Sequence, residues 1–355
     1  MTIALTGGGT GGHLAIVRCL LESAIKKNIE CVYIGSQNGQ DKAWFENEVR
    51  FKEKFFLSSK GVVNQSKFDK ISSLLHTLKL SKDCREIFKK YHIQAVFSVG
   101  GYSAAPASFA ALFSHLPLFI HEQNSKSGSL NMLLKPFATK FFSAFEKEIS
   151  PYPVADKFFD NARIRKELKN IIFLGGSQGA QFINELALNL APKLQEQNIK
   201  IIHQCGKNDF EKCKKHYQSL NIQADIFDFS LNLEEKMKNA DLAISRAGAS
   251  TLFELCANTL PTIFIPYPYA AKNHQYFNAK FLQDQALCQI FMQNSINLDE
   301  FFKSILKLNL ENISTRLQNI TQKNGADMLI QKALFDNLTF ISVGGKIKCN
   351  HRKIK

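Results

Sequence analysis

The amino-acid sequence predicts an α/β fold in which two doubly wound parallel sheets face one another across a cleft. Apolar, strand-like segments alternate with helix-like segments along most of the chain, and this alternation is typical of parallel sheets covered by helices. A glycine-rich turn follows the first strand-like segment of each half, at Gly7–Gly12 and at Gly175–Gly179. The chain has 355 residues, which favours two domains at about 150 residues per domain.

The first half opens with the apolar run Ile3–Leu5, a glycine turn and an apolar helix-like stretch. Later strands are expected at 31–34, 55–57, 95–97 and 118–120, with helices at 41–49 and 66–91. Ligands of doubly wound sheets bind at the carboxyl ends of the strands. Three such ends carry glycine or polar clusters, namely Gly7–His13, Gly100–Ser103 and His121–Asn124. We therefore expect a ligand-binding cleft at this edge.

The second half follows a break at Pro151–Pro153 and a charged stretch that reaches Asn170, which is the composition of a linker. Strands are expected at 171–174, 199–203, 226–229, 242–245 and 262–265, with one helix ending at 194 and others at 276–282 and 327–335. The sequence thus predicts domains at 1–152 and 153–338 and a basic tail at 339–355. We expect this tail to lack regular structure and to contact acidic lipid.

Charge and cysteine content narrow the class of protein. The chain has 45 Lys and Arg against 31 Asp and Glu, a formal net charge of +14. No helix-turn-helix, zinc-finger or RNP pattern accompanies this charge, so nucleic acid is not an expected partner. An anionic membrane surface, a phosphorylated substrate or a generally lysine-rich composition explains it instead. The 8 cysteines form no CxxC pair, and no leader or apolar run of ~18 residues is present, so we expect a cytosolic chain with reduced thiols.

The segment Gly7–His13 has the composition of an anion-binding turn. Glycine allows close backbone approach, and a helix start offers free N–H groups and the positive end of its dipole. A NAD site would add an acidic residue at the end of the second strand, but that strand ends in Gly35-Ser36. No Lys-Ser/Thr pair follows the glycines, which argues against a P-loop. A nucleotide-sugar diphosphate fits this turn better than NAD or ATP; a tight turn without a ligand is the alternative.

Polar residues in three loops of the second half are further candidates. Ser177, in the second glycine loop, is placed to meet a phosphate or to cap the following helix. Glu254 lies about one turn into a helix, where its carboxylate is placed to reach sugar hydroxyls or to interact with the helix dipole. His274 and Gln275 stand at a loop-to-helix junction. They are suited to hydrogen bonding with a hexose or to capping that helix.

Five motifs in order resemble the MurG family of peptidoglycan N-acetylglucosaminyltransferases: GGGTGGH, HEQN, GGSQGA, SRAGASTLFE and PYPYAAKNHQ. The resemblance covers roughly residues 1–335. It implies a GT-B architecture, with UDP-N-acetylglucosamine held between two Rossmann-like domains. It implies transfer of N-acetylglucosamine to the 4-hydroxyl of the muramyl sugar of undecaprenyl-pyrophosphoryl-MurNAc-pentapeptide (lipid I), which gives lipid II for peptidoglycan. The implied location is peripheral, at the cytoplasmic face of the bacterial inner membrane, with cell-wall synthesis and cell-division proteins as candidate partners.

The same resemblance assigns roles to particular residues. Thr10, Gly11, Gly12 and Asn124 are expected at the donor sugar, Ser177 at the diphosphate, Ala249, Ser250, Thr251 and Glu254 at the phosphate and ribose, Gln275 at the N-acetylglucosamine hydroxyls, and the backbone near Phe229 and Ser230 at the uracil. The implied reaction is inverting, so a base takes the proton of the acceptor hydroxyl. His13 is the candidate for this base or for an acceptor-orienting group, because imidazole titrates near working pH. Glu122 is the second candidate.

One family feature is absent from this sequence. Family members carry Gly-Asn-Pro-Val-Arg at the interdomain linker, with the arginine facing the diphosphate, whereas residues 151–155 here are Pro-Tyr-Pro-Val-Ala. Lys157, Arg163 and Arg246 are the candidate replacements. The sequence also has no DxD pair to hold a metal. We therefore expect helix N-termini to stabilise the leaving diphosphate, with no obligate metal and no cofactor.

A helix predicted at 66–91 is the candidate membrane contact. Apolar residues recur at helical spacing and lysines flank them, namely Ile71, Leu74, Leu75 and Leu78 with Lys67, Lys70, Lys79 and Lys82. This pattern is typical of an interfacial helix among anionic headgroups. An ordinary core-facing helix with solvated lysines is the alternative.

Other classes of protein fit the sequence less well. A different GT-B enzyme, such as a lipid glycosyltransferase or a sugar-nucleotide epimerase, is disfavoured by GGGTGGH together with HEQN. A NAD-dependent oxidoreductase is disfavoured by the missing carboxylate and the second glycine loop. A nucleic-acid-binding module would rest on net charge alone.

Overall fold

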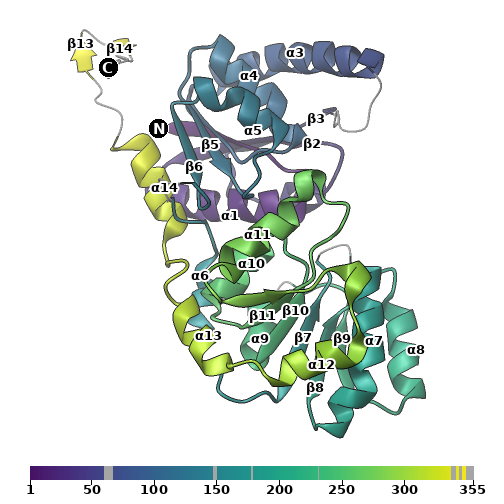
Figure 1. The fold of residues 1–355 in the computed structure, drawn as a ribbon. Coiled ribbons are helices and arrows are strands. Elements are labelled where there is room, and N and C mark those ends of the chain that lie inside the picture. The colour runs from purple at the N-terminus through teal and green to yellow at the C-terminus, as the bar shows by residue number, and fades with distance from the viewer. Residues whose placement is uncertain are drawn as a thin grey trace.

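The computed structural model describes residues 1–59, 67–146, 150–176, 179–230, 232–336, 341–343 and 346–348, with the backbone alone described in 67–71, 341–343 and 346–348. Two six-stranded sheets, each flanked by helices, form the two halves of the molecule (Figure 1). This arrangement confirms the predicted α/β class with two doubly wound sheets.

The first sheet has the strand order β3-β2-β1-β4-β5-β6, and all neighbouring strands are parallel. Its strands are β1 Thr2–Thr6, β2 Glu30–Ser36, β3 Glu53–Leu57, β4 Ile93–Ser98, β5 Leu118–Glu122 and β6 Lys140–Ser143. Every residue of β1 is buried, as expected of a central parallel strand covered on both faces. The helices of this half are α1 Gly11–Lys26, α2 Asp41–Phe45, α3 Lys67–Lys90, η1 Tyr102–Ala104, α4 Ala105–Phe113, α5 Ser129–Leu134 and η2 Lys135–Phe137.

The second sheet repeats this topology, with the order β12-β11-β10-β7-β8-β9 and parallel neighbours throughout. Its strands are β7 Asn170–Leu174, β8 Lys200–Gln204, β9 Ala224–Phe227, β10 Leu242–Ser245, β11 Thr262–Phe264 and β12 Cys288–Ile290. The helices after the first half are α6 Asp156–Asp160, α7 Gln181–Glu196, α8 Phe210–Ser219, α9 Leu233–Asn239, α10 Ala249–Ala257, η3 Ala271–Asn273, α11 His274–Gln283, η4 Gln293–Ser295, α12 Leu298–Leu306, α13 Leu310–Leu317 and α14 Gly325–Leu334.

The strand order places a crevice at the same point of each sheet. The order reverses beside the first strand of each half, between β1 and β4 and between β7 and β10. Ligands of doubly wound sheets bind at such switch points, outside the carboxyl ends of the strands. Because β1 and β7 lead directly into the two glycine loops, both loops lie at these crevices.

Several elements differ from the sequence-based prediction. The edge strands β6 and β12 were not predicted, because their segments, KFFS and CQI, contain no run of three apolar residues. The helix predicted at 41–49 is the shorter α2, Asp41–Phe45. The expectation of a tail without regular structure is wrong for its described part, because β13 Ile341–Val343 pairs with β14 Lys346–Lys348 in an antiparallel arrangement.

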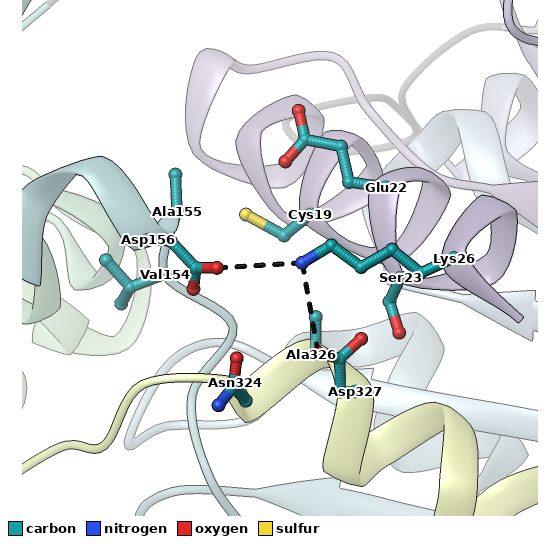
Figure 2. Close-up of a pocket in the computed structure, with 10 residues that line it drawn as sticks. All are labelled: Cys19, Glu22, Ser23, Lys26, Val154, Ala155, Asp156, Asn324, Ala326 and Asp327. Atoms are coloured by element: carbon teal, nitrogen blue, oxygen red, sulfur yellow. Dashed lines mark ion pairs between the residues drawn. The ribbon is translucent and has the colours of Figure 1, made fainter.

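Helix α14 returns from the second half of the chain and lies against α1. Lys26 of α1 extends between two carboxylates, with its Nζ 3.6 Å from Asp156 of the linker helix α6 and 4.0 Å from Asp327 of α14 (Figure 2). All three side chains are partly solvated, so each pair contributes at most about 1 kcal/mol to stability. The domain limits at 1–152 and 153–338 stay a prediction, although α14 packs on the first half.

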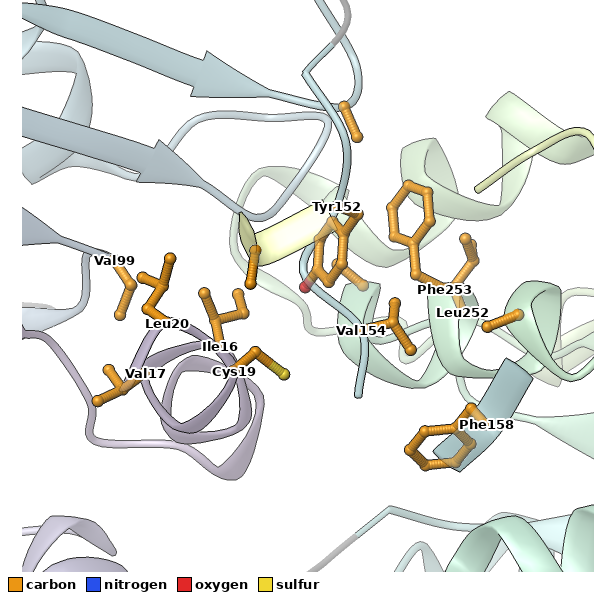
Figure 3. Close-up of a cluster of buried hydrophobic side chains, with 14 of the residues drawn as sticks. Ile16, Val17, Cys19, Leu20, Val99, Tyr152, Val154, Phe158, Leu252 and Phe253 are labelled. Atoms are coloured by element: carbon orange, nitrogen blue, oxygen red, sulfur yellow. The ribbon is translucent and has the colours of Figure 1, made fainter. Parts of the chain in front are cut away.

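A buried hydrophobic cluster continues from one half into the other. It joins Ile16 and Leu20 of α1, Tyr152 and Val154 of the linker, and Phe253 of α10 (Figure 3). Burial of apolar surface stabilises by roughly 25 cal/mol per Å². The cluster therefore opposes separation of the two halves at this seam, on the side of the molecule where α14 also packs.

Two expectations from composition can be compared with the structure. The cysteines in the described part of the chain are free and buried, which confirms the predicted reduced packing residues, while Cys349 lies outside the described residues. Among the described helices, none combines the length and the apolar character needed to span a bilayer.

Candidate functional site

A cleft of about 900 Å³ lies between the two halves, within the range of pockets that hold ligands of nucleotide size. The first half contributes Thr10, Gly11 and Gln40 to its lining, and the second half contributes Gly175, Gly176, Gly179, Ala180, Gln181, Phe182, Glu185, Ser245, Arg246, Gly248, Thr251, Tyr267, Gln275 and Gln293. Both glycine loops therefore border one cavity. Four of the predicted site residues line it, namely Thr10, Gly11, Thr251 and Gln275. Gly12, Ala249 and Ser250 adjoin lining residues in the chain, and His13 contacts the lining residue Thr10. Glu122, Asn124 and Glu254 are not in the lining.

The first glycine loop is held by a carboxylate that the sequence analysis missed. Asp41 is fully buried, and its Oδ2 accepts a hydrogen bond from the Gly9 N–H at 2.6 Å. Its Oδ1 accepts from the Ser36 N–H at 3.0 Å and from the Tyr33 hydroxyl at 3.1 Å. A Cβ on Gly8 would lie 2.3 Å from the same carboxylate, so only glycine fits there. Nothing in the sequence marks this Asp at the start of α2, because its role depends on the partners that the fold brings to it.

His13 stands in the first turn of α1 beside the cleft. Its Nδ1 is 2.9 Å from the Thr10 hydroxyl, and its Nε2 is 3.0 Å from the Gln123 side-chain amide. The ring is half-buried, and loss of water around it, with a smaller contribution from His274, lowers its pKa to about 4. The sequence argument that this imidazole titrates near working pH is therefore wrong. Instead, His13 is neutral at pH 7, which is the form that accepts a proton.

Glu122 organises the loop that follows β5. Its Oε1 accepts from the Asn124 N–H at 2.9 Å, and its Oε2 accepts from the Gly128 N–H and from the Asn131 amide, both at 2.9 Å. The side chain is only 2% exposed. These contacts support a positioning role for Glu122 more strongly than the role of a base in contact with substrate.

Asn124 is held from the opposite half of the molecule. The Asn278 side chain of α11 is fully buried, and its Nδ2 donates to Oδ1 of Asn124 at 3.1 Å and to the Ala247 carbonyl at 3.1 Å. Its Oδ1 accepts from the N–H and the hydroxyl of Ser125, both at 2.9 Å. Both donors and both acceptor positions of this amide are thus used. Asn278 fastens the loop after β5 to the second half, and the sequence analysis did not identify it.

The second glycine loop packs on the end of β8. Gly179 has a φ of +75°, and a Cβ there would lie 2.7 Å from the Cys205 carbonyl oxygen. The loop therefore requires glycine for both its conformation and its close approach. Ser177, the residue expected at the diphosphate, lies outside the described residues. Gly175, Gly176 and Ala180 nevertheless present the loop to the cleft.

The start of α10 contains residues with different environments. Thr251 lines the cleft. The Ser250 hydroxyl instead donates to the Gly12 carbonyl at 3.0 Å and so links α10 to α1. Burial raises the pKa of Glu254 to about 7, with Lys157 lowering it and Glu234 raising it. The carboxylate of Glu254 thus lies near the linker helix and α9, away from the cleft lining.

Gln275 is oriented by the backbone on two sides. Its Oε1 accepts from the Tyr267 N–H at 2.9 Å and from the Ala247 N–H at 3.2 Å. Because the acceptor end of this amide is engaged, its Nε2 hydrogens are the groups available to a sugar hydroxyl in the cleft. This geometry supports the predicted sugar contact.

Only one of the three candidate replacements for the linker arginine lines the cleft. Lys157 pairs with Glu234 at 2.7 Å, and Arg163 pairs with Asp241 at 2.6 Å. Arg246 lines the cleft, and no carboxylate in the described part of the chain forms an ion pair with it. Ala155 itself faces the seam between α1 and α14, so the linker position of the family arginine points away from the cleft here.

Arg246 is held rigidly at this position. Its Nη1 donates to the carbonyls of Ile265 and Pro266 at 3.0 and 3.2 Å, and its Nη2 donates to the Gln293 side chain at 2.8 Å. The guanidinium carbon lies 5.8 and 5.6 Å from the ring centroids of Phe182 and Tyr267. Burial lowers its pKa from the ordinary value, yet an arginine stays charged at neutral pH. The cleft therefore presents a fixed positive charge to an anionic ligand.

Sequence comparisons agree with this geometry. The N-terminal domain model of glycosyltransferase family 28 matches residues 3–143, and the C-terminal domain model matches residues 170–333. A protein of Campylobacter jejuni subsp. doylei is 93% identical over 96% of this chain and 100% of its own length. A protein of Campylobacter fetus is 53% identical over 94% of this chain and 99% of its own length. Both are named UDP-N-acetylglucosamine--N-acetylmuramyl-(pentapeptide) pyrophosphoryl-undecaprenol N-acetylglucosamine transferase.

Solved structures share the fold. The crystal structure of Acinetobacter baumannii MurG matches with a TM-score of 0.76 and 24% identity over 94% of this chain and 98% of its own. The UDP-GlcNAc 2-epimerase of Neisseria meningitidis matches with a TM-score of 0.64 and 12% identity over 95% of this chain and 100% of its own. These likenesses establish the GT-B fold. By its family models and its close relatives, the chain belongs to glycosyltransferase family 28, in the MurG family of UDP-N-acetylglucosamine--N-acetylmuramyl-(pentapeptide) pyrophosphoryl-undecaprenol N-acetylglucosamine transferases.

Proposed function

We propose that the chain transfers N-acetylglucosamine from UDP-N-acetylglucosamine to the muramyl sugar of lipid I and so forms lipid II for peptidoglycan synthesis. The observation that carries this proposal is the cleft between the halves, in which both glycine loops and the cation Arg246 border one cavity. A nucleotide-sugar diphosphate needs this combination of backbone N–H groups and positive charge. Relatives at 93% and 53% identity carry the name of this transferase.

The chemistry follows from where the charged and neutral groups stand. The second half binds the donor, with Gln275 at the sugar and the loop of Gly175–Ala180 at the diphosphate. The acceptor hydroxyl attacks the anomeric carbon from the side of α1, and UDP leaves with inversion. Neutral His13 takes the hydroxyl proton, or orients the hydroxyl for attack. Arg246 and the N-terminus of α7 stabilise the negative charge that grows on the departing diphosphate.

A transfer assay with a lipid I analogue and radiolabelled UDP-N-acetylglucosamine tests the function directly. We expect label in the lipid product only when both substrates are present. Because the fold is shared with a UDP-GlcNAc 2-epimerase, the same donor is incubated alone and its sugar is analysed for the 2-epimer. Epimerised sugar without transfer to lipid would replace this proposal by the epimerase alternative, and an absence of both reactions would refute it.

The lowered pKa of His13 predicts a pH profile for this reaction. At pH 5.5 an imidazole with the ordinary pKa of about 6.5 would be roughly 90% protonated, whereas His13, with a pKa of about 4, remains neutral. A base is active when unprotonated, so we expect kcat/KM to show no acid limb near pH 6.5. The measurement is kcat/KM from pH 5 to 8, which reports groups of the free enzyme.

The control for this profile is Glu254→Gln, because Glu254 has a pKa of about 7 and could add a limb of its own. A limb near pH 6.5 that persists in Glu254→Gln would show that His13 titrates normally and would contradict the expected environment of its ring.

We also propose that helix α3 brings the enzyme to the cytoplasmic face of the inner membrane, where its acceptor lies. In Figure 1 the helix runs along the end of the first half that is remote from the second sheet. Leu74, Leu75 and Leu78 are 50%, 63% and 38% exposed, so these three leucines do not face the core. The side chain of Ile71 lies outside the described residues. Exposed leucines beside lysines match an interfacial helix.

Vesicle binding tests the membrane contact. We expect the triple variant Leu74→Ser, Leu75→Ser, Leu78→Ser to bind vesicles of anionic phospholipid at least about tenfold more weakly, because it removes the apolar side chains that enter the interface. The double variant Lys79→Glu, Lys82→Glu should weaken binding to the same extent, since each lysine near such a surface contributes about 1 kcal/mol. The matched control is Leu220→Ser with Leu306→Ser, because these leucines are 37% and 47% exposed on the second half. Equal binding by the α3 variants, the control and the wild-type chain would refute the contact.

A further inference from the structure

The linker residue Tyr152 contacts both halves of the molecule at the base of the site. Its side chain is 2% exposed. One face of the ring stacks on Phe253 of α10, with centroids 4.2 Å apart and an interplanar angle of 15°. The edge meets the His121 ring of β5 at 5.4 Å and 77°. Figure 3 shows Tyr152 between α1 and Phe253.

The hydroxyl of Tyr152 begins a directed chain of hydrogen bonds. Ser250 donates its only hydroxyl proton to the Gly12 carbonyl at 3.0 Å. The hydroxyls of Tyr152 and Ser250 are 3.1 Å apart, so Tyr152 must be the donor and Ser250 the acceptor. The chain runs from Tyr152 through Ser250 to Gly12, and such chains polarise their members cooperatively.

This relay joins the two helix starts that border the reaction centre. Gly12 lies in the first turn of α1, directly before His13, and Ser250 lies in the first turn of α10 beside the cleft residue Thr251. The two helices approach closely at this point: a Cβ on Gly12 would lie 3.2 Å from the Ser250 hydroxyl.

The relay is anchored at its linker end. A Cβ on Gly325, at the start of α14, would lie 2.6 Å from the Tyr152 carbonyl oxygen, so α14 presses directly on the linker backbone. Burial raises the pKa of the Tyr152 phenol well above its ordinary value, so its proton stays in place across the working pH range. The backbone of Tyr152 is therefore held by α14, its ring by α10 and β5, and its hydroxyl by α10.

We propose that Tyr152 is a positioning residue that acts through Ser250 and sets the separation of the α1 start, with His13, from the α10 start at the donor cleft. The inference rests on the proposed function. It also concerns this chain in particular, because residues 151–155 depart from the linker sequence of the family it resembles. Loss of the relay leaves the donor contacts of the second half intact. It loosens the placement of His13 relative to the bound donor.

The test is Tyr152→Phe, which keeps the stacked ring and removes the first donor, together with Ser250→Ala and the double variant. We expect kcat to fall about tenfold in Tyr152→Phe and further in Ser250→Ala, which loses both hydrogen bonds. The donor KM should change less than about threefold, because the variants loosen the placement of His13 and leave the donor contacts of the second half intact. The double variant should match Ser250→Ala alone within about twofold, because Tyr152 acts through Ser250.

Tyr217→Phe is the matched control, because Tyr217 is also 2% exposed and its hydroxyl makes one buried hydrogen bond, to His203 at 3.0 Å, inside the second half. It should lower thermal stability to a similar extent and leave kcat unchanged. Wild-type kcat in Tyr152→Phe, an equal loss of kcat in Tyr217→Phe, or additive losses in the double variant would each overturn the inference. If the wild-type chain itself transfers no sugar, the proposed function fails and the inference falls with it.

Discussion

His13→Ala is expected to reduce kcat by roughly 10²- to 10⁴-fold, the usual contribution of general acid–base catalysis, while the donor KM changes only a few-fold. The reason is geometric: His13 belongs to α1 in the first half, whereas most of the cleft lining belongs to the second half. Transfer kinetics give kcat, and titration of the protein with UDP-N-acetylglucosamine gives donor affinity independently.

Two variants separate proton transfer from placement. His13→Gln retains hydrogen-bonding capacity toward Thr10 and Gln123 but accepts no proton at neutral pH, so its kcat should be as low as that of His13→Ala. Added imidazole should restore part of the activity of His13→Ala and none of that of His13→Gln, which leaves no space for it. Near-normal turnover in His13→Gln would assign this residue to orientation of the acceptor instead.

Glu122→Gln tests the second candidate for the base. Both carboxylate oxygens of Glu122 are occupied by hydrogen bonds from the loop that they organise. The structure therefore supports a larger effect of this variant on thermal stability than on kcat. A loss of kcat equal to that of His13→Gln, with stability preserved, would make Glu122 the base.

The sequence was sufficient for the fold because each half repeats a short pattern with a clear physical cause. Buried strands followed by glycine and a helix start predict parallel sheets, and the positions of β1, β4, β7 and β10 followed from apolar runs alone. Edge strands β6 and β12 did not, because their segments contain no run of three apolar residues. Helix α14 was predicted, but its packing on α1 was not, because that contact joins segments that are far apart in the sequence.

The candidate site was predictable where a backbone shape is needed and less so where side chains from distant segments meet. The glycine loops can be recognised from composition alone, and residues of both loops line the cleft as expected. Asp41 and Asn278 carry no such signal, since a single Asp or Asn gains its meaning only from the partners that folding brings to it. The pKa of His13 likewise depends chiefly on its burial in the folded chain and to a smaller extent on His274, so it could not be read from the sequence.

Arg246→Gln is expected to reduce kcat/KM for the donor by about 10²- to 10³-fold, the effect of removing one fixed group that stabilises developing charge. The linker arginine of the family is replaced here by Ala155, which faces the seam, and Arg246 is the candidate cation that lines the cleft. Arg246→Lys should recover only part of the loss, because an ammonium group lacks the planar fork of donors. The control is Lys157→Gln. Lys157 pairs with Glu234 and does not line the cleft, so this variant should retain transfer.

Binding of UDP and of uridine distinguishes what Arg246 contacts. A guanidinium aimed at the diphosphate predicts that Arg246→Gln weakens UDP and leaves uridine unchanged, because uridine has no phosphate. The rings of Phe182 and Tyr267 beside the guanidinium allow a different arrangement, in which Arg246 stacks on the uracil. That arrangement predicts that Arg246→Gln loses equal affinity for UDP and for uridine. Calorimetric titration of the variant with each ligand measures this, and equal losses would contradict the diphosphate contact. An effect on UDP alone would show that Arg246, directly after β10, supplies positive charge to the diphosphate.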